Sequence, residues 1–379
     1  MKTSQLVLPV LSAVLVSVLA CASPSAPPPR PAPAPVPAPA PAAKPKAVEP
    51  EGPRVSLVCA PEARRVSFTA LGVEPYTQII DMALSPDRAW LLVDLSHIVE
   101  VGRRAEGATF RTIAGSPDAR WAALDVDPTD GSLWVVSMER LELIHLVPGA
   151  KSQVVKIPRL EGEGGFRDVL VDEEGIYVVP TCAQAALWKV DRSGKVLEQA
   201  FRREGQEPLT LRKEFTKQES QSTLEGCVPV SLAHDQEGRV TVFDGLTRTF
   251  SRQESGAWTP FLTLPAPEDG DELARGGVKV TNPGTEGVIW TSMDTATGNA
   301  RGFFFLDGAP VFQPGIAPLK GDPMAFWLSY VRPSAEGLTR SYERCVTDYF
   351  SPTLVASDRQ GYVSAMGNNL VLGSFPAEP

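Results

Sequence analysis

The chain has 379 residues, of which 43% are hydrophobic and 21% are charged, and its formal net charge is −9 at pH 7. An acidic chain without a run of basic residues is a poor candidate for binding a nucleic-acid backbone or an anionic lipid surface, so we expect no nucleic-acid partner. The length exceeds what a single β-sandwich needs and suits one large closed architecture or two domains.

The first 20 residues have the features of a secretory signal peptide. Behind Lys2, an apolar stretch over residues 6–19 ends on the small-residue site Val18-Leu19-Ala20, and Cys21 follows. The stretch is shorter than the roughly 20 apolar residues that cross a bilayer, and it contains Pro9. The ending resembles the lipobox of bacterial lipoproteins, in which cleavage leaves the cysteine as a lipid-modified N-terminus. We therefore expect lipidation at Cys21, with ordinary secretion as the alternative.

Residues 21–54 are expected to form a tether. Thirteen prolines lie in residues 24–53, largely as a Pro-Ala alternation from Pro31 to Pro41. Such a segment cannot bury a core and favours polyproline II, so it would reach on the order of 90 Å at about 3.1 Å per residue. In the lipoprotein sorting pattern an Asp after the cysteine retains the protein at the inner membrane. The chain has Ala22 there, so the resemblance implies the outer membrane, with a periplasmic or surface-facing domain over residues 55–379.

Four cysteines follow the tether: Cys59, Cys182, Cys227 and Cys345. An even number in an exported chain suggests two disulfides, and three pairings are possible. We expect Cys182–Cys227 and Cys59–Cys345, the second of which would tie the start of the domain to its end. The sequence has no CxxC motif and no Cys/His cluster, so a thiolate zinc site is not expected.

Six segments repeat one pattern: an apolar strand, a turn with Asp, Asn or Pro that ends near Gly, and a second apolar strand. The segments are Met82–Val93, Leu124–Val136, Asp168–Val179, Ser231–Val242, Val278–Trp290 and Leu354–Ser364. Their starts lie between 42 and 76 residues apart, and the shorter intervals match one four-stranded propeller blade each. The pattern predicts an all-β fold, a six-bladed β-propeller, with seven blades as the alternative. We expect an N-terminal strand near Arg65–Ala70 to complete the last blade.

The rhythm of the blades resembles the class of six-bladed propellers that includes NHL repeats, gluconolactonase/regucalcin proteins and TolB-type propellers. This resemblance implies a fold and no particular activity. Two expected insertions interrupt the rhythm, over residues 202–226 and 315–350. The first is highly charged and reads as a partly helical surface excursion. The second carries Phe326, Trp327 and Tyr330, which would form a partner-binding patch if exposed, or else the insertion's own core against the ring.

The residues that bear chemistry do not form a recognisable catalytic set. NHL-type zinc lyases place three histidines at equivalent blade positions, whereas His97, His145 and His234 stand at non-equivalent places in their blades, so a three-histidine metal site is not expected. Asp81, Asp125 and Asp168 occupy similar places in three successive hairpins. They would bind a cation or a basic ligand if they line the channel mouth, or else cap turns and meet solvent or arginine.

The sequence contains no Gly-x-Ser-x-Gly motif and no phosphate-binding glycine loop, so we expect no catalytic residue and no cofactor. These observations predict a membrane-anchored lipoprotein whose propeller is a non-catalytic binding or scaffold module. Its expected partner is an envelope protein or a cell-wall polymer. The alternative is a metal-dependent propeller hydrolase or lactonase that uses the channel carboxylates.

Overall fold

The computed structural model describes residues 53–59, 63–71, 78–103, 110–115, 120–157, 165–180, 187–200, 209–213, 220–224, 230–244, 249–264, 278–281, 288–291, 302–319, 322–346, 354–366 and 368–374. The chain divides into Met1–Lys44 and Pro45–Pro379, and all described residues belong to the second unit. The signal peptide, Cys21 and nearly all of the tether therefore lie outside the described residues. No helix in the described ranges is long and apolar enough to cross a membrane.

The described part of the chain contains six four-stranded antiparallel sheets, each of which is one propeller blade. The first blade consists of β2 (Ile79–Leu84), β3 (Arg88–Val93), β4 (His97–Gly102) and β5 (Phe110–Gly115). The second consists of β6 (Trp121–Val126), β7 (Leu133–Ser137), β8 (Glu142–Leu146) and β9 (Gln153–Lys156). The third consists of β10 (Phe166–Val171), β11 (Ile176–Pro180), β12 (Leu187–Val190) and β13 (Val196–Ala200).

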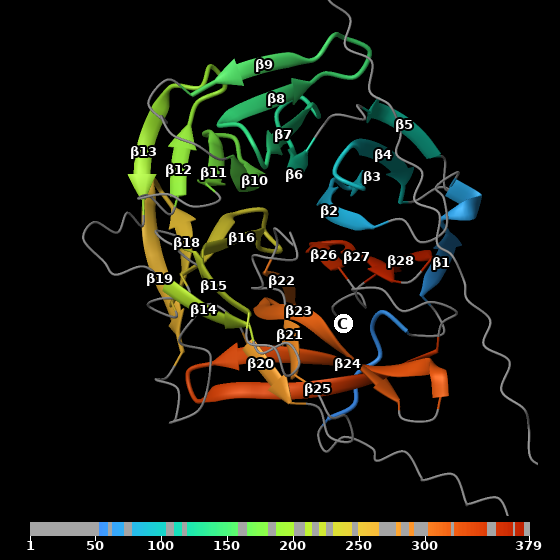
Figure 1. Cartoon of the computed structure of the whole chain (residues 1–379). Coiled ribbons are helices and arrows are strands. Elements are labelled where there is room, and N and C mark those ends of the chain that lie inside the picture. The colour runs from blue at the N-terminus through green and yellow to red at the C-terminus, as the bar shows by residue number, and fades with distance from the viewer. Residues whose placement is uncertain are drawn as a thin grey trace, which may run out of the picture. The chain divides into compact units, whose positions relative to one another are not determined.

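The fourth blade consists of β16 (Val230–His234), β17 (Val240–Asp244), β18 (Thr249–Glu254) and β19 (Ala257–Thr263), and the fifth of β22 (Phe303–Leu306), β23 (Ala309–Leu319), β24 (Asp322–Ser334) and β25 (Gly337–Val346). The sixth combines β26 (Leu354–Asp358), β27 (Gly361–Met366) and β28 (Asn369–Ser374) with β1 (Arg64–Ser67) from the N-terminal side. Each innermost strand contacts those of the two neighbouring blades, and β26 contacts β2, so the ring is closed (Figure 1). The expected six-bladed propeller is confirmed.

Burial explains why the inner strands are mostly apolar. Each inner strand packs against neighbouring blades on both faces, and β10 and the adjacent β11 are accordingly buried almost throughout. Outer strands such as β9 expose most of their side chains. Between the fourth and fifth blades the core is aromatic, with ring centroids 4.4 to 5.9 Å apart among Phe243, Phe250, Phe303, Phe305 and Phe312.

The N-terminal strand closes the ring, as expected. Strand β1 pairs antiparallel with β28, from Arg64 opposite Leu372 to Ser67 opposite Asn369. The strand is shorter than the expected range and is followed by a short 3-10 helix, η1 (Thr69–Leu71). The sixth blade therefore exists only when both ends of the domain meet.

A disulfide and a buried carboxylate hold the segment before β1. The expected Cys59–Cys345 disulfide is confirmed, although Cys345 lies in the outer strand of the fifth blade and not in the last blade. Beside it, the Glu343 carboxylate accepts hydrogen bonds from the backbone N–H groups of residues 57, 58 and 59 at 2.6, 3.0 and 2.8 Å. The expected partners Cys182 and Cys227 lie outside the described residues.

The structure corrects the sequence-based account of the fifth blade. The hairpin expected over Val278–Trp290 forms a separate two-stranded sheet of β20 (Val278–Thr281) and β21 (Val288–Thr291). The blade is built from β22 to β25 instead, so most of the expected insertion over 315–350 is blade strand. The turn between β22 and β23 is Asp307-Gly308, with φ of 51° and 72°, as a tight hairpin turn requires. The prolines in β23 and β24 hide this pattern in the sequence.

The other expected insertion is separate from the six blades, as expected, but it contains strands. Residues 202–226 contain the two-stranded sheet of β14 (Leu209–Lys213) and β15 (Ser220–Leu224), where a partly helical excursion was expected. Its strands lie between the third and fourth blades in sequence.

The aspartates of the hairpin turns cap their own backbone and also join neighbouring blades. Asp127 accepts from the Thr129 N–H at 2.9 Å, and its carboxylate binds Arg192 of the third blade at 2.7 and 2.9 Å. Asp358 of the sixth blade binds Arg103 of the first blade in the same way, through both guanidinium Nη atoms. Each arginine also donates to a backbone carbonyl in the inner turn of its own blade, Asp172 O for Arg192 and Ser85 O for Arg103. We call this arrangement the inter-blade clasp.

The clasp at Asp127 makes stability depend on pH. Burial opposes ionisation of Asp127, but the hydrogen bonds from Arg192 and Thr129 outweigh it and lower the pKa from 3.8 to about 2. The folded state therefore favours the ionised form, a contribution that is present above about pH 4 and is lost as the pH falls towards 2. We expect Asp127→Asn to lower the free energy of unfolding by about 1–2 kcal/mol at pH 7, allowing for the partly exposed arginine.

Urea unfolding of both proteins between pH 7 and pH 2 measures this difference, which should shrink towards zero at the acid end. The matched control is Asp130→Asn in the same turn, whose exposed carboxylate caps the Ser132 N–H and acts on Arg192 through its charge alone, so a smaller effect is expected. A difference that stays constant over the whole range would contradict the ionic contribution.

Candidate functional site

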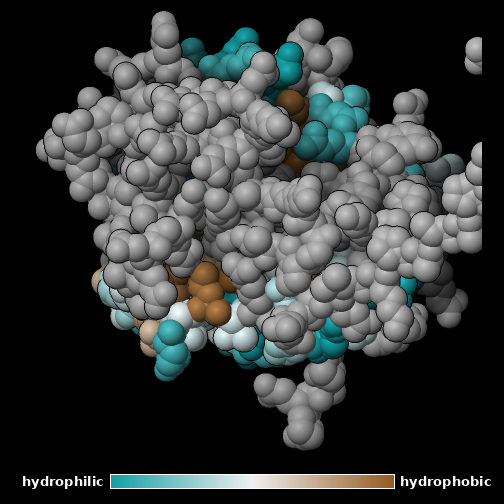
Figure 2. Space-filling model, turned by 60° about the horizontal axis from the view of Figure 1, so that its bottom comes forward, coloured by the Kyte–Doolittle hydropathy of each residue, from teal (hydrophilic) through white to brown (hydrophobic). Residues whose placement is uncertain are grey.

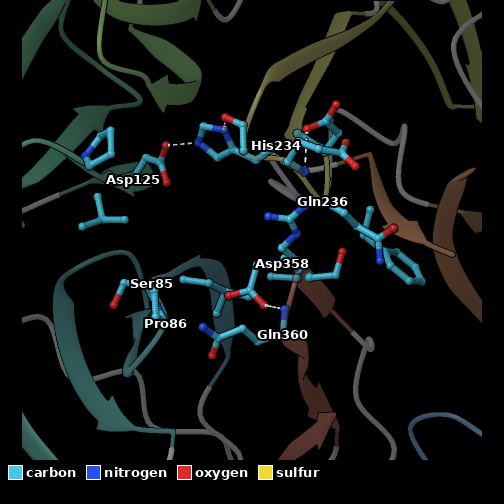
Figure 3. A pocket seen from close by; sticks show the side chains of 18 of the residues that line it. Ser85, Pro86, Asp125, His234, Gln236, Asp358 and Gln360 are labelled. Carbon is cyan, nitrogen blue, oxygen red and sulfur yellow. Dashed lines mark hydrogen bonds and ion pairs between the residues drawn. The ribbon is translucent and has the colours of Figure 1, made fainter. Parts of the chain in front are cut away.

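A cavity of about 360 Å³ opens at one end of the central channel, within the size range of small-molecule sites. All six blades contribute to it, through the ends of their inner strands and the turns that follow (Figure 3). The lining residues are apolar on the strands and polar on the turns: Leu84–Pro86, Asp125, Val126, Pro128, Val171, Ala233–Gly238, Phe303, Phe304 and Val355–Gln360.

The three aspartates singled out from the sequence are buried, and each accepts a hydrogen bond from the inner strand of the next blade. Asp81 Oδ2 accepts from the Leu124 N–H at 2.9 Å, and Asp125 Oδ2 from the Val171 N–H at 2.8 Å. Asp168 Oδ2 accepts from Leu232 at 3.3 Å. The repeated pattern is therefore real, but its observed contacts join blades. Of the three, Asp125 alone lines the cavity.

The alternative of a cation held by channel carboxylates lacks a matching set of ligands in the described residues. The one described group close enough to share an ion is Cys59, Glu343 and Cys345. Its two sulfur atoms are joined in the disulfide, and its carboxylate already accepts the three backbone N–H groups and the Tyr330 hydroxyl. Calcium needs six to eight oxygen ligands, which this group does not offer.

His234 and Asp125 form a pair in the wall of the cavity (Figure 3). His234 Nε2 lies 2.8 Å from Asp125 Oδ2, and Nδ1 lies 3.1 Å from the Gly238 carbonyl oxygen. Both ring nitrogens are therefore within hydrogen-bond distance of an oxygen of the protein, and neither faces the cavity without a partner. A substrate would have to displace one of these contacts before His234 could exchange a proton with it. Ser85 lies away from the pair, on another side of the cavity (Figure 3).

The other two histidines are not brought to the cavity. His97 in β4 bonds the Ser96 hydroxyl at 2.7 Å, and His145 in β8 stacks on Trp134 with ring centroids 4.2 Å apart. Both lie on third strands of their blades, whereas His234 ends an inner strand. The structure thus places the three histidines at the non-equivalent positions that the sequence indicated.

The expected partner-binding aromatic residues belong to the fifth blade. Trp327 and Tyr330 are buried in β24, with the Arg54 guanidinium 4.3 Å from the Trp327 ring centroid. The Tyr330 hydroxyl donates to Glu343 at 2.7 Å, and burial together with the Glu343 charge raises its pKa well above the usual value. These two side chains pack the blade and offer no exposed patch. The Phe326 side chain lies outside the description.

Exposed apolar side chains are scattered over the described surface. The large ones are single residues on several blades: Val147, Val154, Leu197, Phe261 and Val346. On the face seen in Figure 2 the described surface is mainly hydrophilic, with small apolar areas. The cavity is therefore the more distinctive feature.

Sequence reasoning missed the turn residues that shape the mouth, notably Gln236, Arg359 and Gln360. Each follows a turn aspartate in the repeated pattern, in Asp-Gln-Glu-Gly and Asp-Arg-Gln-Gly. The pattern marks the turns, but only the closed ring brings six of these strand ends to one place.

Comparisons with known proteins found only distant similarities. No family model matches the chain, and no curated protein matches it. Among solved structures, it resembles virginiamycin B lyase from Staphylococcus aureus (11% identity, TM-score 0.46, 83% of this chain and 99% of that one). It also resembles YCF48 bound to D1 peptide (13%, 0.43, 87% and 100%) and a gluconolactonase from Xanthomonas campestris (13%, 0.45, 87% and 96%). Such distant similarities do not bear on the activity of this chain.

The contacts of Asp81 predict a structural role that does not depend on metal. Asp81→Ala leaves the buried Leu124 N–H without its carboxylate acceptor, so we expect the free energy of unfolding to fall by roughly 1–3 kcal/mol. Calcium should not restore it, and EDTA should not change the melting temperature of the unaltered protein. Glu139→Ala, which removes an exposed ion pair, is the control with little expected effect. Destabilisation by EDTA that calcium reverses would revive the metal alternative.

Proposed function

We propose that this chain is a lipid-anchored propeller of the bacterial cell envelope that binds a ligand at the channel mouth without transforming it. The ligand is a component of the envelope, either a protein or a polymer, part of which enters the cavity. The Pro-Ala tether would hold the domain away from an outer-membrane surface, facing the periplasm or the outside.

The observation that carries this proposal is that the acidic side chains and the histidine of the cavity wall already have partners. Asp125 and His234 bind each other, and Asp235 binds Arg239 and Arg252, with the arginine Nε atoms at 2.8 Å. The Ser357 hydroxyl exchanges hydrogen bonds with the Phe305 backbone of the preceding blade. A wall whose acids and histidine are paired suits recognition, whereas a catalyst needs a base or nucleophile that is available to substrate.

The anchoring half of the proposal rests on residues 1–54. The apolar core before Cys21 and the proline-rich segment after it are the supporting features. In the structure, residues 53–59 precede β1, and the disulfide and Glu343 fasten them to the fifth blade. A force applied along the tether would therefore act on the Cys59–Cys345 disulfide before it acted on β1.

The anchor is tested by Cys21→Ala, which we expect to move the protein from the membrane pellet to the soluble fraction, because no acyl chain is attached. The matched variant is Ala22→Asp, which should stay in the membrane but shift to the density of the inner membrane. Fractionation of both, followed by immunoblotting, gives the answer. If Cys21→Ala remained with the membrane, the lipoprotein assignment would be wrong.

The binding site is tested by Gln360→Trp, which places an indole at the rim of the cavity from an exposed turn position. We expect native mass spectrometry of the protein, isolated from its own envelope, to show a bound component that this variant lacks. Glu336→Trp, at an exposed turn of the fifth blade away from the cavity, is the control that should keep it. Equal retention in both variants would place the ligand elsewhere. A chemically altered, released component would indicate an enzyme.

A further inference from the structure

One of the charged residues that line the cavity has no partner among the described residues. Four carboxylates line the cavity, and each is paired with a basic side chain: Asp125 with His234, Asp235 with Arg239 and Arg252, Glu237 with Arg239, and Asp358 with Arg103. Arg239 and Arg252 also pair with Glu254, which lies outside the lining. Arg359 also lines the cavity, and it makes no hydrogen bond or ion pair with any described residue.

The inter-blade clasp explains why Arg359 has no counter-ion among the described residues. Its sequence neighbour Asp358 would be the obvious partner, but that carboxylate is bound by the nearly buried Arg103. Asp358 Oδ1 also accepts from the N–H groups of Gln360 at 2.9 Å and Gly361 at 3.1 Å. The turn that carries Arg359 is therefore fixed by bonds that do not involve the Arg359 side chain.

The surroundings of Arg359 suit an anion with an apolar body. The inner strands contribute apolar residues such as Val126, Val171 and Val355 to the cavity. Gln236 and Gln360 lie with Asp358 on the side of the cavity away from Asp125 (Figure 3). The Gln236 Oε1 atom accepts from the Gly308 N–H at 2.5 Å, which leaves the amide NH₂ group to donate to a ligand.

We propose that the channel mouth binds an organic carboxylate, whose anionic group pairs with Arg359 while its apolar body lies against the inner-strand residues. This inference rests on the proposed binding function and specifies its ligand. A guanidinium matches a carboxylate through two parallel hydrogen bonds. A dianionic phosphate would bring a second negative charge close to four carboxylates, where the described residues offer one arginine without a partner, so a carboxylate fits better. The group belongs either to a small free acid or to the carboxyl end of a peptide.

The proposal is tested by saturation-transfer NMR on the detergent-solubilised full chain. The probes are hexanoate and 4-phenylbutyrate for the free acid, and the peptide Gly-Ala-Leu with a free or an amidated carboxyl end for the chain terminus. Hexanamide, 4-phenylbutanamide and hexylammonium serve as uncharged and cationic counterparts. We expect the carboxylates to bind about tenfold more tightly than the amides, and less tightly as salt is raised.

Arg359→Gln should weaken the carboxylates to the level of the amides and leave the amides unchanged, whereas Arg359→Lys should keep part of the preference. Arg344→Gln removes an exposed arginine of β25 outside the cavity and should change nothing. Equal binding of acids and amides, unchanged binding by Arg359→Gln, preference for hexylammonium, or no binding of any probe would overturn the inference. If the inference fails in this way but Gln360→Trp loses the native envelope component and Glu336→Trp keeps it, the proposed binding function still stands.

Discussion

Closure of the ring is the constraint on which the rest of this structure depends. A propeller has no independent blade at its seam: the sixth sheet forms when β1, from the start of the domain, pairs with β28 near its end. This pairing spans only four residues on each strand. It has to stay formed although the expected tether directly precedes this part of the sequence. The Cys59–Cys345 disulfide and the Glu343 carboxylate fix the preceding segment, and the Arg103–Asp358 clasp joins the sixth blade to the first.

Closure of the ring engages most of the charged groups near the channel in contacts between blades. Inner strands present unpaired backbone groups at the blade junctions, and a buried N–H without a partner is costly. Asp81, Asp125 and Asp168 satisfy such groups on the adjacent blade. What resembles a set of catalytic acids in the sequence is therefore largely part of the ring. In the described part of the chain, closure leaves a small cavity with an apolar wall, paired carboxylates and one arginine, Arg359, without a partner.

Recognition at such a mouth fits a rigid scaffold. The turns around the cavity are held by aspartate caps, such as Asp235 with the N–H groups of Glu237 and Arg239, so little ordering is required when a ligand enters. The turn that carries Arg359 is fixed in the same way, by the hydrogen bonds that Asp358 accepts from the N–H groups of Gln360 and Gly361. Ligand specificity would come from the side chains of two or three turn residues. The ring fixes the backbone of these turns without using those side chains.

The sequence by itself determined the local features of this protein. Alternation, turn aspartates and glycines predicted five of the six inner hairpins, the closing strand and the Cys59–Cys345 pair, because each depends on short-range periodicity or on the cysteines themselves. It misassigned the fifth blade, where Asp307-Gly308 stands between a phenylalanine-rich strand and a strand that contains prolines, while a regular hairpin lies just upstream.

Only the tertiary structure decided what the chemical groups do. Asp81 and Asp168 join blades, and Trp327 and Tyr330 pack a core. Arg359 has no partner in the part of the chain that the structure describes, because Arg103, far away in sequence, binds Asp358. The physical reason is that a charge acquires its role from the partner it meets, and in a closed ring those partners come from other blades.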